Sequence, residues 1–255
     1  MIESMNRNHT RLFLPLFLFF LCVRVASAQE LPWSFSVSGG WAYMSLSQVD
    51  EDNKLDVEGW HRQGVFINPL GSVKSALMLT AKGTYRVDRD YVLSLTVAHA
   101  MREVSSSYSG FDASLDLTRS IGFTDALVGI YLYSPFIPLN AEVYAGGEAG
   151  IMFARAEAEA YGTRTQKVAD TSQTSIVVDS KGTYSINKLV LNVVAGADVH
   201  VFDPLFVRFE AKYKFGKVGK MEGDVRRFTT MSTEETSIEF DYSGLFLTVG
   251  IGIVF

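Results

Sequence analysis

The sequence predicts an all-β protein, an eight-stranded antiparallel transmembrane β-barrel of the up-and-down type. Beyond Gln29, segments with period-2 alternation recur, and no apolar run approaches the length of a membrane-spanning helix. Most of these segments carry large apolar residues on one face and small, polar or charged residues on the other. Short and long connections alternate between them, which is typical of barrels that cross a membrane with their strands.

The last predicted strand, residues 245–255, shows the pattern most clearly. Every odd position from Leu245 to Phe255 is apolar, and the other face carries Phe246, Thr248, Gly250, Gly252 and Val254. Because successive side chains of a strand point to opposite faces, one face is large and apolar and the other is smaller. Lipid outside and a narrow lumen inside would require this arrangement.

The N-terminal residues 1–28 are predicted to be a cleaved signal peptide, which leaves residues 29–255 as one barrel domain. A polar, weakly basic segment precedes a mostly apolar run, and Ala26-Ser27-Ala28 supplies small residues at the cleavage positions. The alternative, a membrane-spanning helix, is disfavoured because Pro15 and Arg24 interrupt a run that is shorter than the ~20 residues a bilayer needs.

The cysteine content and net charge limit the chemistry of the mature chain and the kinds of partner that it can bind. The single cysteine, Cys22, lies in the predicted signal peptide, so the mature chain is expected to contain no disulfide and no thiol nucleophile. Loss of three arginines and Glu3 with that segment takes the formal net charge from −5 to −7. A mildly acidic exported protein without a basic cluster is a poor candidate for binding nucleic acid.

The alternation places eight strands along the chain. We expect them at about residues 33–46, 75–86, 91–104, 121–133, 141–161, 184–202, 205–218 and 245–255. Eleven residues at ~3.3 Å per residue and ~40° tilt cover roughly 25 Å, the height of the apolar band of such barrels. Aromatic residues are expected in girdles at the rims, with Trp33, Tyr91, Tyr133, Phe202 and Phe255 at one end and Tyr43 and Tyr213 nearer the other.

Four long polar connections are predicted as outer loops, at about residues 47–74, 105–120, 162–183 and 219–236. The first contains Trp60 and Phe66, which are candidates for an extracellular contact surface or for folding over the barrel mouth, and part of it could form an extra hairpin. Residues 155–159 and 238–242 keep the alternation and would extend strands beyond the membrane as a β-collar.

The inward faces of the predicted strands are rich in charge of both signs. An eight-stranded barrel is just wide enough for side chains to fill it, so these charges are expected to pair across the lumen. The candidates are Lys82, Arg86, Arg102, Asp125, Glu142, Glu148, Lys188, Asp198, His200, Arg208, Glu210, Lys212 and Lys214. We therefore expect a plugged or gated lumen. Replacing Glu148 or Asp198 with alanine should open the lumen if that residue bridges it. His200 is expected to be a hydrogen-bonded lumen residue, and the alternative is that it acts as a gate by changing its protonation state.

The chain resembles the family of small eight-stranded outer-membrane proteins that includes the OmpA transmembrane domain, OmpX and OmpW. The alternating residues Val249, Ile251 and Ile253 with the terminal Phe255 look like the C-terminal assembly signal of that family. The resemblance implies the outer membrane of a diderm bacterium, contact with outer-membrane lipid and recognition by the barrel-assembly machinery. OmpW-like members are associated with a hydrophobic lumen, from which the inward charges of this chain depart, and no peptidoglycan-binding module is expected after the last strand.

Catalysis is a minority interpretation. Some barrels of this size modify lipid A, but His99-Ala100-Met101 and His200-Val201-Phe202 lack the serine of the deacylase type. The best remaining match, His61 with Asp179-Ser180, is a common loop combination. No metal-ligand spacing or phosphate-binding glycine loop is present in the sequence, so we expect neither an enzyme nor a cofactor.

Two functions remain as predictions. The first is a monomeric structural or surface-interaction protein, with an extracellular ligand at its loops. The alternative is a narrow channel for small solutes or ligands, which requires the lumen ion pairs to exchange partners.

Overall fold

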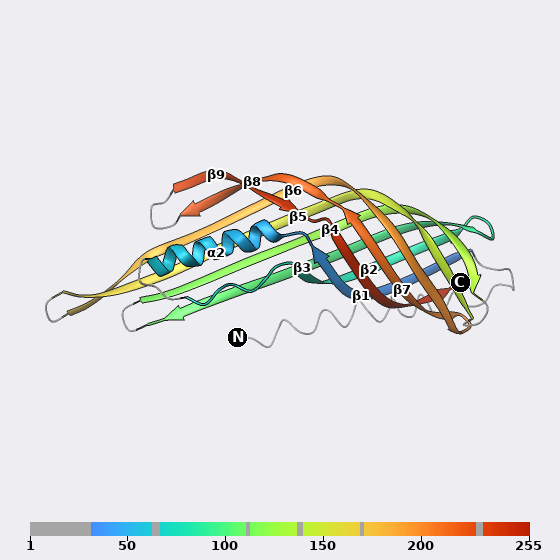
Figure 1. Ribbon diagram of the computed structural model, residues 1–255, viewed down its shortest axis with the longest axis horizontal. Coiled ribbons are helices and arrows are strands. Elements are labelled where there is room, and N and C mark those ends of the chain that lie inside the picture. Colours follow the sequence, from blue (N-terminus) through green and yellow to red (C-terminus); the bar gives the residue numbers. More distant parts are fainter. Residues whose placement is uncertain (1–31, 63–66, 111–112, 137–139, 169–170, 228–231) are drawn as a thin grey trace, which may run out of the picture.

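The computed structural model describes residues 32–62, 67–110, 113–136, 140–168, 171–227 and 232–255 (Figure 1). The elements are β1 (Trp33–Met44), α2 (Ser47–Arg62), β2 (Ser75–Arg86), β3 (Tyr91–Ser109), β4 (Ala113–Phe136), β5 (Ala141–Val168), β6 (Thr171–Phe202), β7 (Leu205–Phe215), β8 (Lys217–Arg227), β9 (Ser232–Asp241) and β10 (Gly244–Val254). The predicted signal peptide lies outside these residues.

Eight strands close into an antiparallel barrel, which confirms the predicted fold. They follow the ring β1, β2, β3, β4, β5, β6, β7 and β10. The ring closes where β1 pairs with β10, in register from Ser34 opposite Val254 to Met44 opposite Gly244. Closure leaves no free edge around this part of the sheet, so its backbone groups are paired without help from solvent.

No helix in the described part of the chain is long and apolar enough to cross a bilayer.

The apolar side chains of the barrel point outward. On β10, Leu247, Val249 and Ile251 are 42, 54 and 69% exposed, whereas Phe246 and Thr248 are buried. The same alternation runs along β3, where Leu95 is 63% exposed and Thr96 is fully buried. A soluble barrel would have the opposite arrangement, with apolar residues inside. An apolar band around the whole barrel is what a membrane-spanning barrel presents to lipid.

The barrel has two different ends, named here the turn end and the extended end. The turn end carries the short connections, such as residues 87–90 between β2 and β3 and residues 203–204 between β6 and β7. At the extended end, β3 to β6 continue far beyond the ring, and the β8–β9 hairpin joins them by pairing with β6 (Figure 1).

Three of the four predicted long loops are therefore wrong, because most of their residues belong to strands. Residues 105–109 extend β3, residues 162–168 and 171–183 extend β5 and β6, and residues 219–227 form β8. The β-collar predicted at residues 155–159 and 238–242 is part of this larger sheet, except that β9 ends at Asp241. Small and polar residues weaken the alternation there, while Leu115, Leu117 and Tyr184 on the inner face are buried.

The first predicted loop contains the helix α2 instead of an extra hairpin. Its residues Val49, Asn53 and Val57 are buried, at the four-residue spacing that places them on one helix face. Val49 belongs to the same apolar cluster as Val104 and Tyr184, and Val57 clusters with Leu115 and Leu117. The helix therefore covers the inner face of the extended sheet (Figure 1).

The predicted aromatic girdle is present at the turn end with one correction. Trp33, Tyr91 and Phe202 are 53, 50 and 62% exposed, as lipid-facing aromatic residues should be. Tyr133 is buried inside the barrel, because it shares the inward face of β4 with Tyr131.

Candidate functional site

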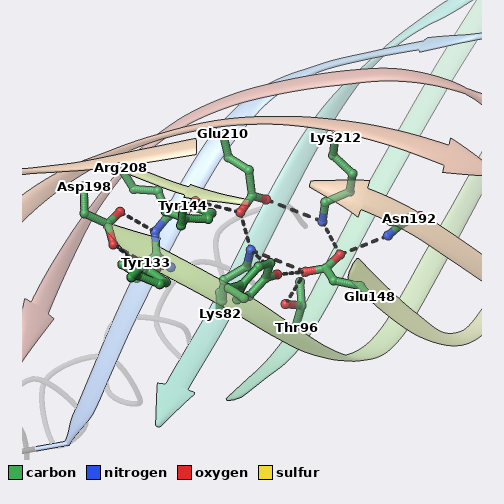
Figure 2. A network of polar contacts seen from close by, with 12 residues as sticks. Lys82, Thr96, Tyr133, Tyr144, Glu148, Asn192, Asp198, Arg208, Glu210 and Lys212 are labelled. Atoms are coloured by element: carbon green, nitrogen blue, oxygen red, sulfur yellow. Dashed lines mark hydrogen bonds and ion pairs between the residues drawn. The ribbon is translucent and has the colours of Figure 1, made fainter. Parts of the chain in front are cut away.

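The centre of the lumen holds a buried group of four charges. Lys82 pairs with Glu210 and lies 3.3 Å from Glu148, while Lys212 lies 2.8 Å from Glu148 and 3.5 Å from Glu210. Each cation therefore contacts both carboxylates (Figure 2). The four side chains are at most 4% exposed. Two charges of each sign therefore balance one another in a buried region of the lumen.

Neutral polar side chains complete the coordination of these carboxylates. Tyr131 donates a hydrogen bond of 2.5 Å to Glu148, and Thr96 and Asn192 each donate one of 3.0 Å. Tyr144 donates to Glu210 over 2.9 Å. A buried ion pair is favourable only when such partners replace the lost water, and these donors come from β3, β4, β5 and β6.

A second buried pair lies nearer the turn end. Arg208 on β7 and Asp198 on β6 face one another in register and form two hydrogen bonds of 2.7 Å each. The remaining donors of Arg208 reach Ser36 at 3.0 Å and Tyr133 at 3.2 Å. The guanidinium group of Arg208 on β7 thus connects to β6, β4 and β1, and Figure 2 shows its contacts with Asp198 and Tyr133.

A third pair borders an apolar layer toward the extended end. Lys214 lies 2.5 Å from Asp125, and its ammonium group lies 3.5 Å from the ring centre of Phe123. Phe123 contacts Phe246 and Tyr242 edge-on, with ring centres 5.8 and 5.7 Å apart. All of these side chains are buried, so the lumen is filled first by ions and then by aromatic rings.

A cavity of about 990 Å³ occupies the turn end of the barrel. Its walls include Arg86, Glu142 and His200, together with Asp198 of the bidentate pair. Glu142 lies 2.6 Å from Arg86 and 3.6 Å from His200, and all three side chains are partly exposed. The cavity extends inward as far as Asp198, whose partner Arg208 is buried.

The structure places eleven of the thirteen predicted lumen residues in these contacts, and it places Arg102 and Lys188 elsewhere. Both side chains are exposed, and neither has an ion-pair partner among the described residues. Arg102 lies past the last β2–β3 pair, Leu77 with Met101, and Lys188 lies past the last β6–β7 pair, Leu191 with Phe215. Each cation is therefore outside the closed part of the barrel, which is a correction to its prediction as a lumen ion pair.

Sequence reasoning misses the neutral partners of the network. The alternation places Tyr131 on an inward face but gives it no role, and it does not identify Tyr144, Thr96 and Asn192 as ligands of the carboxylates. The available signal is their inward register, since each shares a strand face with a predicted charge or a buried residue. What alternation cannot provide is the level of each residue along the barrel axis, which depends on the stagger between strands.

The remaining predicted residues have different outcomes. Trp60 is partly buried and packs against the cluster of Val57 and Leu115, so it is not a free contact surface. Phe66 lies outside the described residues. Val249 and Ile251 face outward, and the proposed assembly role of the strand that ends at Phe255 stays a prediction. Among the described residues, no group of three His, Cys, Asp or Glu side chains could hold a metal ion.

An eight-stranded ring with its apolar residues outside and its ions inside decides the fold type. The chain has the fold of the small eight-stranded outer-membrane β-barrels. No protein-family model and no curated protein matches the sequence.

Solved structures of such barrels align with most of the chain at low identity. A major outer membrane protein from Thermus thermophilus has 12% identity and a TM-score of 0.46, covering 88% of this chain and 99% of that one. OprG from Pseudomonas aeruginosa has 12% identity and a TM-score of 0.44, covering 89% and 97%. Ail from Yersinia pestis, crystallised with the heparin analogue sucrose octasulfate, has 13% identity and a TM-score of 0.41, covering 88% and 100%.

Proposed function

We propose that this protein is an outer-membrane barrel with a closed lumen, whose function lies in the sheet and helix that it holds outside the membrane. The single observation that carries the proposal is the neutral packing of the lumen. Four cations, Lys82, Arg208, Lys212 and Lys214, meet four carboxylates, Asp125, Glu148, Asp198 and Glu210.

Ion flow through this lumen would require buried ion pairs to separate. Each carboxylate of the central group has two cations and at least one neutral donor, so exchange of one partner leaves another charge unpaired. An uncompensated buried charge costs about 3–5 kcal/mol. The aromatic layer of Phe123, Phe246 and Tyr242 is a second barrier in series with the first.

The orientation follows from the two ends. In outer-membrane barrels the short turns face the periplasm and the long segments face outward. We therefore place the turn end in the periplasm and the extended sheet with α2 at the cell surface of a diderm bacterium, after export by the signal peptide of residues 1–28. The assembly machinery would recognise Val249, Ile251, Ile253 and Phe255 of the last strand.

A narrow channel is the second candidate, and the cavity at the turn end favours it. That cavity lies at the turn end of the lumen and reaches inward to Asp198. In this case the central ion pairs would act as the gate. A lipid-modifying enzyme is a third and weaker interpretation, with no further support from the geometry of His61, whose ring donates a hydrogen bond to the Ile67 carbonyl.

Planar-bilayer recording of the refolded full chain tests the choice. Folding is first checked by heat-modifiable migration on a denaturing gel and by β-rich circular dichroism in detergent. We expect folded protein that inserts without steady conductance. A sizeable steady conductance of the unmodified protein would establish the channel and reject the closed lumen.

A further inference from the structure

The cavity at the turn end has the size and the lining of a site for a small ligand. Its volume is about 990 Å³, and such sites commonly measure about 300–1,000 Å³. Three charged or titratable side chains, Arg86, Glu142 and His200, lie together in its wall. The apolar part of the lining includes Trp33, Val92, Tyr133 and Phe206.

Two guanidinium–carboxylate pairs lie at this end of the barrel, and they differ in how completely their hydrogen bonds are made. Arg208 uses all three side-chain nitrogen atoms, because Nε and Nη2 bind Asp198 and Nη1 binds Ser36. Arg86 makes one side-chain hydrogen bond, of 2.6 Å from Nη2 to Oε2 of Glu142. Its Nε and Nη1 have no acceptor among the described residues. The guanidinium group of Arg86 therefore has donors to spare.

The carboxylate of Glu142 is only half used as well. Arg86 and His200 both lie at its Oε2 atom, at 2.6 and 3.6 Å, and its Oε1 atom has no donor in the described part of the chain. The side chains of Arg86 and Glu142 are 37 and 24% exposed and line the cavity. The guanidinium group also lies 5.5 Å from the ring centre of Tyr133, which helps to fix its position. The wall thus presents open donors beside an open acceptor.

Other polar side chains of the lining are occupied or lie at the rim. Ser34 and Thr84 share a hydrogen bond of 2.5 Å. Asp88 accepts hydrogen bonds from two backbone N–H groups of its own turn, at 2.9 and 2.8 Å. Arg89 and Asp203 are exposed charges of opposite sign on the turns at the rim. Within the described lining, the open charged side chains below the rim are therefore Arg86 and Glu142.

An open cation beside an open anion favours a ligand that carries both charges. A ligand carboxylate fits the free N–H groups of Arg86, and a ligand ammonium group fits Oε1 of Glu142. A ligand with one charge would satisfy one of these groups and would lie close to a like charge of the wall. Because Arg86 and Glu142 are in direct contact, the two ligand charges must be separated by only one or two carbon atoms.

We propose that the turn-end cavity binds a small zwitterion, with its carboxylate on Arg86 and its ammonium group on Glu142. The apolar part of the lining, which includes Val92 and Phe206, would hold its side chain. The inference goes beyond the closed lumen of the proposed function. It depends on the geometry of the turn end and not on the direction in which the barrel is inserted.

Calorimetric titration of the refolded full chain in a nonionic detergent tests this inference, with empty micelles as the blank. Three probes share one aromatic ring: phenylalanine carries both charges, phenethylamine only the ammonium group and 3-phenylpropionate only the carboxylate. We expect phenylalanine to bind about tenfold more tightly than either analogue, because it makes one more contact with a charged group. In Arg86→Gln it should bind no better than phenethylamine, and in Glu142→Gln no better than 3-phenylpropionate.

The matched controls are Lys181→Gln and Glu159→Gln, which remove the charges of an exposed ion pair at the extended end. Both should keep the tenfold preference for phenylalanine. Absent or equal binding of the three probes by the unmodified protein overturns the site, and so does an equal loss in the control variants. The probe comparison uses the unmodified chain, so it decides the proposal even where a variant does not fold. Steady conductance of the unmodified protein would contradict the closed lumen instead, and the two failures are thereby distinguished.

Discussion

Arg208 binds Asp198 across the β6–β7 ladder through two hydrogen bonds of equal length, 2.7 Å from Nε and 2.7 Å from Nη2. Their strands follow one another in the chain, and the register places the two residues directly opposite. The fork of the guanidinium group fits a carboxylate in this geometry. Because the pair is buried, removal of one partner would leave an uncompensated charge inside the barrel and lower the stability of the fold.

We predict that Asp198→Asn destabilises the barrel by about 3–5 kcal/mol, because Arg208 keeps its charge and loses its counter-ion in a buried site. Urea unfolding in detergent or lipid vesicles, followed by the heat-modifiable gel band, measures the change. The compensating variant Asp198→Leu/Arg208→Met removes both charges and should recover most of the stability. If the double variant is as unstable as Asp198→Asn, shape and not charge controls this site.

We predict that Glu148→Ala alone leaves the lumen closed, in contrast to the expectation from sequence. The aromatic layer of Phe123 and Phe246 remains as a second barrier when the carboxylate is removed. Adding Phe123→Ala and Phe246→Ala should open a path that prefers anions, because Lys82 and Lys212 have then lost Glu148. Planar-bilayer conductance shows whether each variant is closed or open, and the reversal potential shows whether the open path prefers anions.

The control for this series is the pair Phe123→Ala/Phe246→Ala with Glu148 intact. It should stay closed, since the neutral central group still fills its level of the lumen. Conductance from Glu148→Ala by itself would show that the aromatic layer does not seal the barrel.

We predict that Tyr242→Phe stabilises the protein by about 1 kcal/mol. The hydroxyl of Tyr242 is buried and has no hydrogen-bond partner within the described residues. Burying this hydroxyl therefore destabilises the folded state, because no hydrogen bond replaces the one it makes with water in the unfolded state. Thermal or urea unfolding measures the gain. Tyr144→Phe is the matched control: its hydroxyl donates to Glu210 over 2.9 Å, so its removal should destabilise by about 1–3 kcal/mol. A loss of stability in Tyr242→Phe would reveal a bound water at that hydroxyl.

We predict that Val249→Arg destabilises the protein in vesicles by about 2–4 kcal/mol, because Val249 lies halfway along the outward stripe of β10. Leu245→Arg, near the outer end of the same stripe, should cost only about 0–1 kcal/mol. Folding into vesicles against urea measures the two values. Equal, small effects at both positions would mean that water and not lipid surrounds the strand.

The alternation of apolar and polar residues is enough to predict most of the barrel. β2 has the predicted bounds. The inward register also points to residues that the structure buries, among them Lys82, Glu148, Asp198, Arg208, Glu210, Lys212 and Lys214. This succeeds because a strand has only two faces, so neighbours along the chain fix the face of each residue. The same local rule predicts loops where small and polar residues weaken the pattern, as at residues 105–109 of β3.

The sequence by itself determined which side chains face inward and that their charges could balance. Only the tertiary structure decided which charges meet, because the stagger between strands sets the level of each residue along the axis. It is this stagger that brings Lys82 to Glu210, 128 positions away, and that leaves Arg102 and Lys188 beyond the ends of β2 and β7. The helix α2 likewise depends on the inner face of the extended sheet, since its own residues Val49 and Val57 are buried only there.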